Sequence, residues 1–352
     1  MNTPHPIRWE KAYGGIAAKA NEFIHSQLPN GKDATFLEFR RHIMRKVPQQ
    51  GISSMDILFA IWKGVQVYII EEGIGDLLLN TSLGAVDLKH FNLPYDAIYV
   101  DLPPNDFTVS YSMPGYVQTA RLEGIYVMQD PITVLDLETI RARVGGMEGI
   151  DGVPLRPITF IPVSGIIKES SIPNDDCLFT FPMFFKEGCL RSQVEARMDE
   201  FVVRAVNRGA DEKDFEALKM NLESFKGAFE WLINIVLYIT MPKARVDGGK
   251  GNLGIPFKKL VPKPARKSAS GTRVFVVGRG IKISPLDACE PGAPKGGTVG
   301  AMKRAHWVRG HYRVVPYGPK DTEPRPTRLK WILPFPRGKG KDYIKNMYRV
   351  TV

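Results

Sequence analysis

Residues Asp211–Thr240 read DEKDFEALKMNLESFKGAFEWLINIVLYIT and carry the pattern of a long amphipathic helix. Asp211 and Asp214 lie in its first turn, where negative charge favours a helix start. The apolar side chains that follow recur at spacings of three and four, which places them on one face. They are Phe215, Leu218, Leu222, Phe225, Phe229, Leu232 and Val236. A helix this apolar must be buried, so we predict that it packs against a sheet.

Other helical patterns lie before this one. The predicted helices are Ala34–Val47, a segment from Ser53 toward Glu72, and Ser192–Asn207. In the first, apolar residues recur along one helix face. The second starts with Ser-Ser-Met-Asp, which is typical of an N-cap followed by an acid in the first turn. We expect Gly73 and Gly75 to end it.

Short apolar runs between Pro and Gly residues predict strands. They are Ala97–Leu102, Phe107–Tyr111, Tyr116–Met128 with a break near Gly124, Ile158–Lys168, Cys177–Phe185, Thr272–Ile283, His306–Val315 and Arg328–Leu333. The short turns at 103–106 and 113–115 suit a meandering antiparallel sheet. The predicted fold class is therefore α+β: a mixed helical and antiparallel-sheet body followed by a small, basic, β-rich C-terminal module.

The net charge of +11 is unevenly distributed along the chain. Residues 242–352 hold 25 Lys plus Arg against 6 Asp plus Glu, a balance of +19, whereas residues 1–241 hold 23 against 31, a balance of −8. Such a split indicates two surfaces with different partners. We predict an acidic body at 1–241, a basic linker rich in Lys, Pro and Gly at 242–271, and a basic aromatic module at 272–352.

Several classes of protein do not fit the composition. Three cysteines without a C-x-x-C pair argue against a disulfide framework or a cysteine zinc site. The N-terminus lacks the basic start and apolar segment of a signal peptide. The most apolar segments are interrupted by charge or are too short to cross a bilayer. We therefore expect a cytoplasmic protein with no membrane association, no metal and no cofactor.

The densest cluster of basic and aromatic residues is KRAHWVRGHYR at 303–313. If 307–313 is one strand, its period of two places four of these side chains on one face: Trp307, Arg309, His311 and Arg313. Cations neutralise phosphates, and flat rings stack on unpaired bases. We predict an RNA- or ribosome-facing surface formed by Lys303, Arg304, His306, Trp307, Arg309, His311, Arg313, Lys330 and Trp331, with Tyr317 beside it. The alternative is a solvated basic hairpin with both tryptophans in a small core.

His306 and His311 also suit a general acid and base for metal-free RNA cleavage. A stacking surface uses histidine equally well without chemistry, so binding is the preferred interpretation. No nucleophile elbow, P-loop or HExxH motif is present elsewhere. We therefore expect no catalytic residues.

The segment RAHWVRGH at 304–311, followed by RLKWILP at 328–334, resembles the C-terminal signature of a phage and plasmid anti-CRISPR family, that of the second type V-A anti-CRISPR protein. The resemblance continues through Val276–Arg279 and Trp231–Met241, with a weaker match at Asn92–Asp101. It covers the last third well and the middle loosely, and the first ninety residues show no match.

The resemblance implies a regulator that recognises the nascent N-terminal peptide of the type V CRISPR nuclease in the bacterial host. Recognition would cause translation-dependent loss of the encoding mRNA. One part would bind the peptide and the basic part would contact RNA or the ribosome. The alternatives are a metal-independent ribonuclease using His306 and His311, and a structural protein that binds nucleic acid nonspecifically.

Overall fold

The computed structural model has a mixed α+β fold. It describes residues 4–28, 34–43, 52–113, 116–131, 133–134, 154–164, 180–196, 212–241, 244, 246–247, 273–278, 282–285, 306–319, 324–333, 335–337 and 348–351. The predicted linker at 242–271, apart from 244 and 246–247, lies outside these residues.

The elements agree in large part with the sequence patterns. The helices are α1 (His5–Tyr13), α2 (Ile16–Gln27), α3 (Phe36–Ile43), α4 (Ile52–Trp62), α5 (Glu72–Leu79), the short η3 (Leu88–His90) and α8 (Glu212–Ile239). The strands of the body are β1 (Gln66–Ile70), β2 (Thr81–Ser82), β3 (Ala97–Asp101), β4 (Thr108–Met113), β5 (Tyr116–Gln129), β6 (Thr133–Val134), β7 (Pro154–Ser164) and β8 (Phe181–Phe185). The later strands are β9 (Val246–Asp247), β10 (Val274–Val277), β11 (Lys282–Pro285), β12 (His306–Val308), β13 (Gly310–Pro316), β14 (Thr327–Ile332), β15 (Phe335–Arg337) and β16 (Tyr348–Thr351).

A nine-stranded sheet forms the centre, in the order β6-β7-β5-β3-β1-β10-β9, with β4 paired to β5 and β8 to β7. Strands β3, β5, β7 and β8 pair antiparallel, as expected. Strand β1, however, runs parallel to both β3 and β10, so the sheet is mixed rather than antiparallel. Parallel neighbours need a crossover connection, and the chain between β1 and β3 contains α5 and η3.

The helix predicted from Ser53 toward Glu72 is wrong beyond Trp62. Helix α4 ends there, Gly64 takes a positive φ of 74°, and the chain continues as β1. Glycine adopts this left-handed backbone without the cost that a Cβ would add. The following VQVYII is rich in β-branched residues and is buried on both sides, so an apolar run that suggested a helix forms a central strand.

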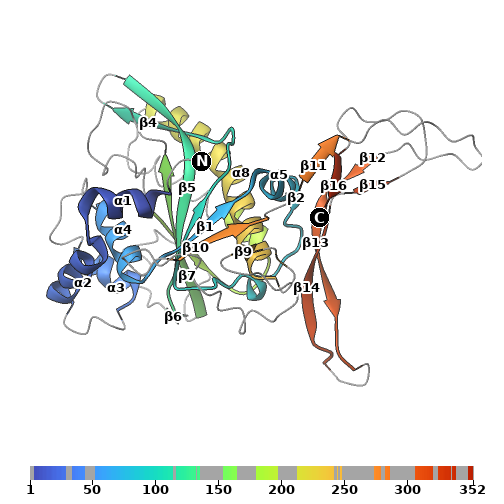
Figure 1. Cartoon of the computed structure of the whole chain (residues 1–352), viewed down its shortest axis with the longest axis horizontal. Helices are drawn as coiled ribbons and strands as arrows, with labels where there is room; N and C mark the ends of the chain where they lie inside the picture. The colour runs from blue at the N-terminus through green and yellow to red at the C-terminus, as the bar shows by residue number, and fades with distance from the viewer. Residues whose placement is uncertain are drawn as a thin grey trace, which may run out of the picture.

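Both faces of the central sheet are covered by helices (Figure 1). Alternate residues of each strand enter different cores: Ile98 and Val100 pack with α5 and α8, whereas Ala97 and Tyr99 pack with α1–α4. The predicted break near Gly124 takes the form of an irregularity: β5 is one continuous strand, and its pairing with β7 shifts between Leu122 and Gly124. The sheet is thus the middle layer of three.

Helix α8 supplies the core on one face of the sheet, as its sequence predicts. Phe229, Leu232 and Val236 are buried, whereas the side chains of the first half of the helix, 212–225, lie outside the described residues. Trp231 donates from Nε1 to the carbonyl of Gly75 at 2.9 Å. Among the described residues, no helix is long and apolar enough to span a membrane.

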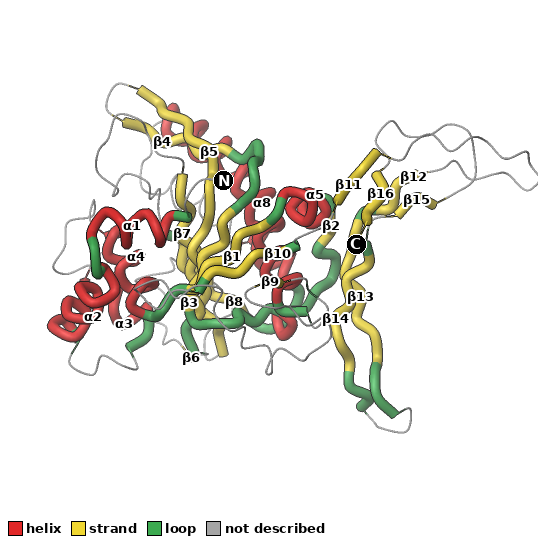
Figure 2. The backbone as a smooth tube through the Cα atoms, viewed as in Figure 1, coloured by secondary structure: helices red, strands yellow, loops and turns green. Residues whose placement is uncertain are grey.

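The C-terminal region departs from the predicted module at its first strand. Strand β10 lies between β1 and β9 in the central sheet, so 274–277 belongs to the body rather than to a separate module. Strands β13 and β14 form an antiparallel hairpin, and β13 also pairs with β2 to give a three-stranded sheet. Beyond β2 the hairpin projects away from the body (Figure 2).

Asn234 on α8 links three elements of this arrangement. Its side-chain Nδ2 donates to the carbonyls of Leu78 and Thr81, at 3.0 and 2.9 Å. Its main-chain carbonyl accepts a hydrogen bond from the Tyr312 hydroxyl at 2.9 Å. The side chain is 1% exposed, so these carbonyls have no access to water if the amide is removed.

We predict that Asn234→Ala lowers the free energy of unfolding by about 2–3 kcal/mol, because two buried carbonyls lose their donors. Urea denaturation measures this. Asn80→Ala is the matched control, since the exposed Asn80 donates to the Asp76 carbonyl in the same way and its loss leaves that carbonyl to water. Equal losses for the two variants would show that burial does not decide the effect.

Candidate functional site

The β13–β14 hairpin has two chemically different faces. Side chains paired across an antiparallel ladder point to the same side, and successive residues alternate. The register pairs Tyr312 with Trp331 and Arg313 with Lys330. The inner face therefore carries Tyr312, Val314, Leu329 and Trp331, and the outer face carries His311, Arg313, Val315, Tyr317, Arg328, Lys330 and Ile332.

The inner face attaches the hairpin to the body. Trp331 is half-buried, donates from Nε1 to the Thr81 hydroxyl at 3.2 Å, and lies edge-on to Tyr238 with ring centroids 5.2 Å apart. Tyr312 and Leu329 pack against the same core. In this arrangement the Trp331 ring serves packing, which is the role that the alternative interpretation of the sequence assigned to it.

The outer face concentrates positive charge. Arg313 and Lys330 are exposed and directly opposite one another, although like charges in this position destabilise a sheet. The described hairpin residues, 310–319 and 324–333, contain four Lys or Arg and no Asp or Glu. No ion pair within the described part of the chain involves Arg313 or Lys330. Such a surface favours an anionic partner that supplies the missing counter-charge.

The single strand assumed for 307–313 is interrupted at Arg309. Strand β12 pairs with β15, whereas β13 pairs with β14 and β2. Arg309 is exposed between the two strands, and its carbonyl lies 3.3 Å from Nδ1 of the half-buried His311. His311 and Arg313 do share the outer face, as the period of two predicts.

The remaining predicted residues are only partly placed. His306 and Trp307 form β12, opposite Arg337 and Pro336, and their side chains are not described. Lys303 and Arg304 lie outside the described residues. The assignment of these residues to an RNA-facing surface stays a prediction.

Arg328 is an outer-face residue that the sequence analysis missed. Its guanidinium carbon lies 5.9 Å from the ring centroid of Tyr317, and both side chains are exposed. Tyr317 donates its backbone N–H to the Pro326 carbonyl at 2.9 Å, so the ladder reaches beyond β13 itself. The signal for Arg328 is its spacing: it precedes Lys330 by two residues, and a strand places residues two apart on the same face.

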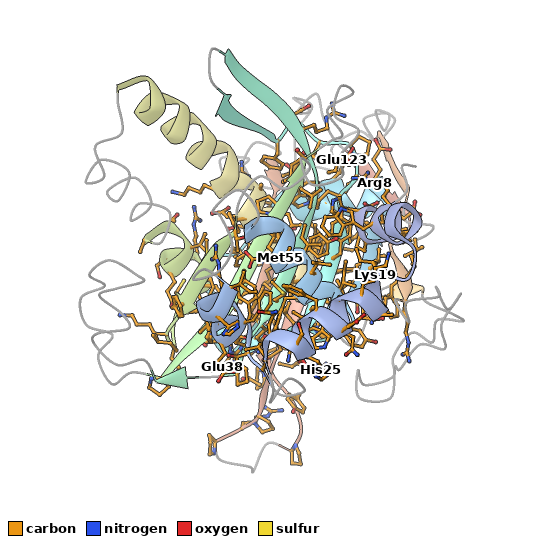
Figure 3. The ribbon with its side chains drawn as sticks, turned by 90° about the vertical axis from the view of Figure 1, so that its left-hand side faces the viewer. Arg8, Lys19, His25, Glu38, Met55 and Glu123 are labelled. Carbon is orange, nitrogen blue, oxygen red and sulfur yellow. The ribbon has the colours of Figure 1, made fainter. Side chains whose placement is uncertain are left out.

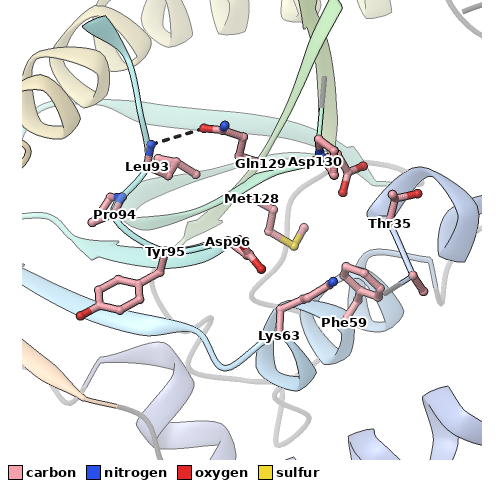
Figure 4. A pocket seen from close by; sticks show the side chains of 12 residues that line it. Thr35, Phe59, Lys63, Leu93, Pro94, Tyr95, Asp96, Met128, Gln129 and Asp130 are labelled. Carbon is pink, nitrogen blue, oxygen red and sulfur yellow. Dashed lines mark hydrogen bonds between the residues drawn. The ribbon is translucent and has the colours of Figure 1, made fainter. Parts of the chain in front are cut away.

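A second candidate site is a pocket of about 480 Å³ in the body (Figure 4). It is lined by residues 93–96 and 128–131 together with Ala34, Thr35, Phe59 and Lys63. Met128 and the side chains of Asp96 and Lys63 point into the same space. The size suits a small ligand or a few side chains of a peptide.

Opposite charges lie at different parts of this pocket. Lys63 Nζ stands 5.6 Å from the Phe59 ring centroid and 5.0 Å from that of Trp62. Asp96 is exposed at the turn before β3. Asp130 is already engaged, because its carboxylate accepts the backbone N–H groups of Phe36 and Leu37 at 2.7 and 3.0 Å. Burial raises the pKa of Asp130, and these two bonds partly oppose that shift.

The N-terminus of α1 is held by a buried polar cluster. His5 Nδ1 lies 2.8 Å from the Tyr126 hydroxyl, and Arg8 forms an ion pair with Glu123 at 2.9 Å (Figure 3). Burial, with a smaller effect of Arg8, lowers the pKa of His5 to about 3. Burial, reinforced by Glu123, raises the pKa of Asp101 to about 7. This cluster joins α1 to the sheet and does not belong to the lining of the pocket described above.

Within the residues described, no group of three or more His, Cys, Asp or Glu side chains could hold a metal ion.

Comparisons with known proteins identify relatives. A sequence model named AcrVA2-like, described as the anti-CRISPR type V subtype A2 family, matches residues 68–337, which confirms the resemblance found in the sequence. Among solved structures, the crystal structure of AcrVA2 matches at 14% sequence identity, covers 95% of this chain and 99% of that chain, and has a TM-score of 0.49. No curated protein matches the chain.

The buried cluster predicts a pH-dependent difference between the protein and its Asp101→Asn variant. In the folded protein the pKa of Asp101 is raised from its ordinary value of 3.8 to about 7, so the carboxyl group stays protonated over most of this range. Its stabilising contribution is therefore fully present below pH 3.8 and is lost as the pH rises toward 7. The neutral Asn does not titrate, so the variant should gain stability relative to the protein between pH 4 and 8.

Urea denaturation at intervals across this range tests the prediction. His5 acts in the opposite direction, because its lowered pKa makes the folded state lose stability as the pH falls from 6.5 toward 3. Only the difference between variant and parent is therefore informative. Parallel curves for the two proteins would show that Asp101 ionises normally.

Proposed function

Because the chain belongs to the anti-CRISPR type V subtype A2 family, we propose that it recognises the nascent N-terminal peptide of a type V-A CRISPR nuclease. Through this recognition it lowers the mRNA of the nuclease in a translation-dependent way. The basic hairpin contacts RNA or the ribosome, and the body binds the peptide.

The observation that carries the proposal is the outer face of the hairpin. Arg313 and Lys330 stand opposite each other without a carboxylate among the described hairpin residues, while the inner face is used for docking. A dense array of phosphates relieves this repulsion and releases counterions on binding. Ribosomal RNA and messenger RNA both present phosphates at high density, so either could neutralise the cations of the outer face.

The pocket of the body is the proposed place for the peptide. It combines an aromatic ring, a thioether and charges of both signs, at Phe59, Met128, Lys63 and Asp96. Apolar walls with a few polar groups are the usual composition of a ligand site. Methionine adapts its shape to its ligand, which suits binding of extended peptides. A peptide and an RNA held on one chain gain affinity through effective concentration.

No observation favours the ribonuclease alternative. His311 is half-buried beside the Arg309 carbonyl, and the His306 side chain is not described. The nonspecific structural role remains the outcome to expect if the protein binds many nucleic acids and silences no message.

The central prediction concerns a reporter that carries the first codons of a susceptible nuclease. We expect its mRNA to fall when the protein is present, to fall equally after synonymous recoding, and to persist after a frameshift that destroys the peptide. Quantitative RNA measurement with translation on and off checks this. Silencing that survives the frameshift, or that is lost on recoding, would mean that RNA sequence is read instead.

Hairpin variants separate the two parts in the same assay. Arg313→Ala with Lys330→Ala should weaken silencing while leaving peptide binding intact. Lys89→Ala with Lys186→Ala is the matched control, because both lysines are exposed on the body and the change in net charge is equal.

The pocket predicts a second outcome. Asp96→Lys should weaken binding of the labelled nuclease N-terminal peptide by about tenfold, because it replaces a carboxylate of the pocket with a second lysine and so removes the charge complementarity proposed for the peptide. Fluorescence anisotropy with the purified full-length protein measures this. Asp106→Lys makes the same charge change at an exposed position outside the pocket lining and should leave affinity unchanged. Equal affinities for all three proteins would place the peptide elsewhere.

A further inference from the structure

The end of the hairpin farthest from β2 presents an aromatic ring together with a guanidinium. Tyr317 is 46% exposed, with Arg328 above it at 5.9 Å from the ring centroid. The backbone N–H of Tyr317 donates to the Pro326 carbonyl at 2.9 Å. The adjacent Gly318 carbonyl accepts a hydrogen bond from the Arg325 guanidinium at 3.0 Å. An exposed ring on a fixed backbone is prepared to stack without a large loss of entropy.

The cations of the outer face extend from this ring toward the body. Arg328 lies two residues from Lys330, and Lys330 is opposite Arg313, so three cations follow the ring on the same face. All three side chains are exposed. Rings beside a row of cations are the general means by which proteins hold single strands: phosphates follow the cations and bases stack on the rings.

We propose that the outer face binds an unpaired segment of RNA, with one base stacked on Tyr317 and the adjacent phosphates on Arg313, Arg328 and Lys330. This inference rests on the proposed function for the identity of RNA as the partner, and it adds the class of RNA and the residue that selects it. A paired base in an A-form duplex keeps both of its faces inside the stack, so Tyr317 selects for bases that are free.

A purely structural role for the Tyr317–Arg328 pair makes a different prediction. A pair that only stabilised the hairpin would affect every RNA equally, because it would act through the position of the cations. A stacking ring affects unpaired RNA alone and leaves the salt dependence unchanged, since it contacts no phosphate.

The experiment measures binding of the full-length protein to a labelled unstructured RNA of about 12 nucleotides and to a duplex of equal length, across a range of salt concentrations. Tyr317→Leu should weaken binding to the unpaired RNA by about tenfold and change the affinity for the duplex by less than about twofold. The dependence of the affinity on salt concentration should stay the same. Tyr317→Phe, which keeps the ring, should bind as the parent does. Arg313→Ala with Lys330→Ala should weaken both RNAs and reduce the slope by about one per side chain.

Val314→Ala is the control on the inner face, where a 44% exposed apolar side chain lies one residue from Arg313, and it should bind both RNAs unchanged. Thermal melting confirms that each variant is folded. Equal losses on both RNAs for Tyr317→Leu, or no loss on either, would overturn the inference, as would absence of RNA binding by the parent.

The two proposals fail separately. Tyr317-dependent binding of unpaired RNA, together with silencing that is indifferent to Arg313→Ala with Lys330→Ala, would support the inference and refute the proposed function. Silencing that needs the two cations, together with RNA binding that is indifferent to Tyr317→Leu, would refute the inference alone.

Discussion

The main-chain carbonyl of Asn234 and the hydroxyl of Thr81 hold the hairpin on the body. The amide satisfies carbonyls at the end of α5 and at β2, while the main chain of Asn234 accepts the Tyr312 hydroxyl and Thr81 accepts the Trp331 indole. The two amide bonds are buried, where leaving a partner unpaired is costly, and the two bonds to the hairpin are part-buried. They decide which hairpin face turns toward α8, and therefore which face remains for a ligand.

The three-layer body gives this attachment a rigid base. Strands β3 and β5 are buried on both sides, so their alternate residues stabilise two cores at once. Helices α1–α4 cover one face, and α5 and α8 cover the other, next to which the hairpin projects (Figure 1). The pocket is lined by α4 and by segments next to β3 and β5, and none of its lining residues belongs to the hairpin.

That separation has a consequence for the proposed function. A peptide in the pocket and an RNA on the hairpin do not compete for space, and the acidic body does not attract RNA into the pocket. The hairpin tolerates a like-charge pair because its inner face supplies the docking energy. Stability and binding are thus assigned to opposite faces of the same two strands.

Local patterns in the sequence were sufficient for α8, for the irregularity in β5 near Gly124, for the charge division, and for the family signature. Each depends on neighbours a few residues apart, which periodicity and composition report. The parallel placement of β1 and the inclusion of β10 in the central sheet depend on partners far along the chain. Only the tertiary structure decided these, because strand register and burial arise from long-range pairing, and they alone determine whether a ring such as Trp331 packs inward or faces solvent.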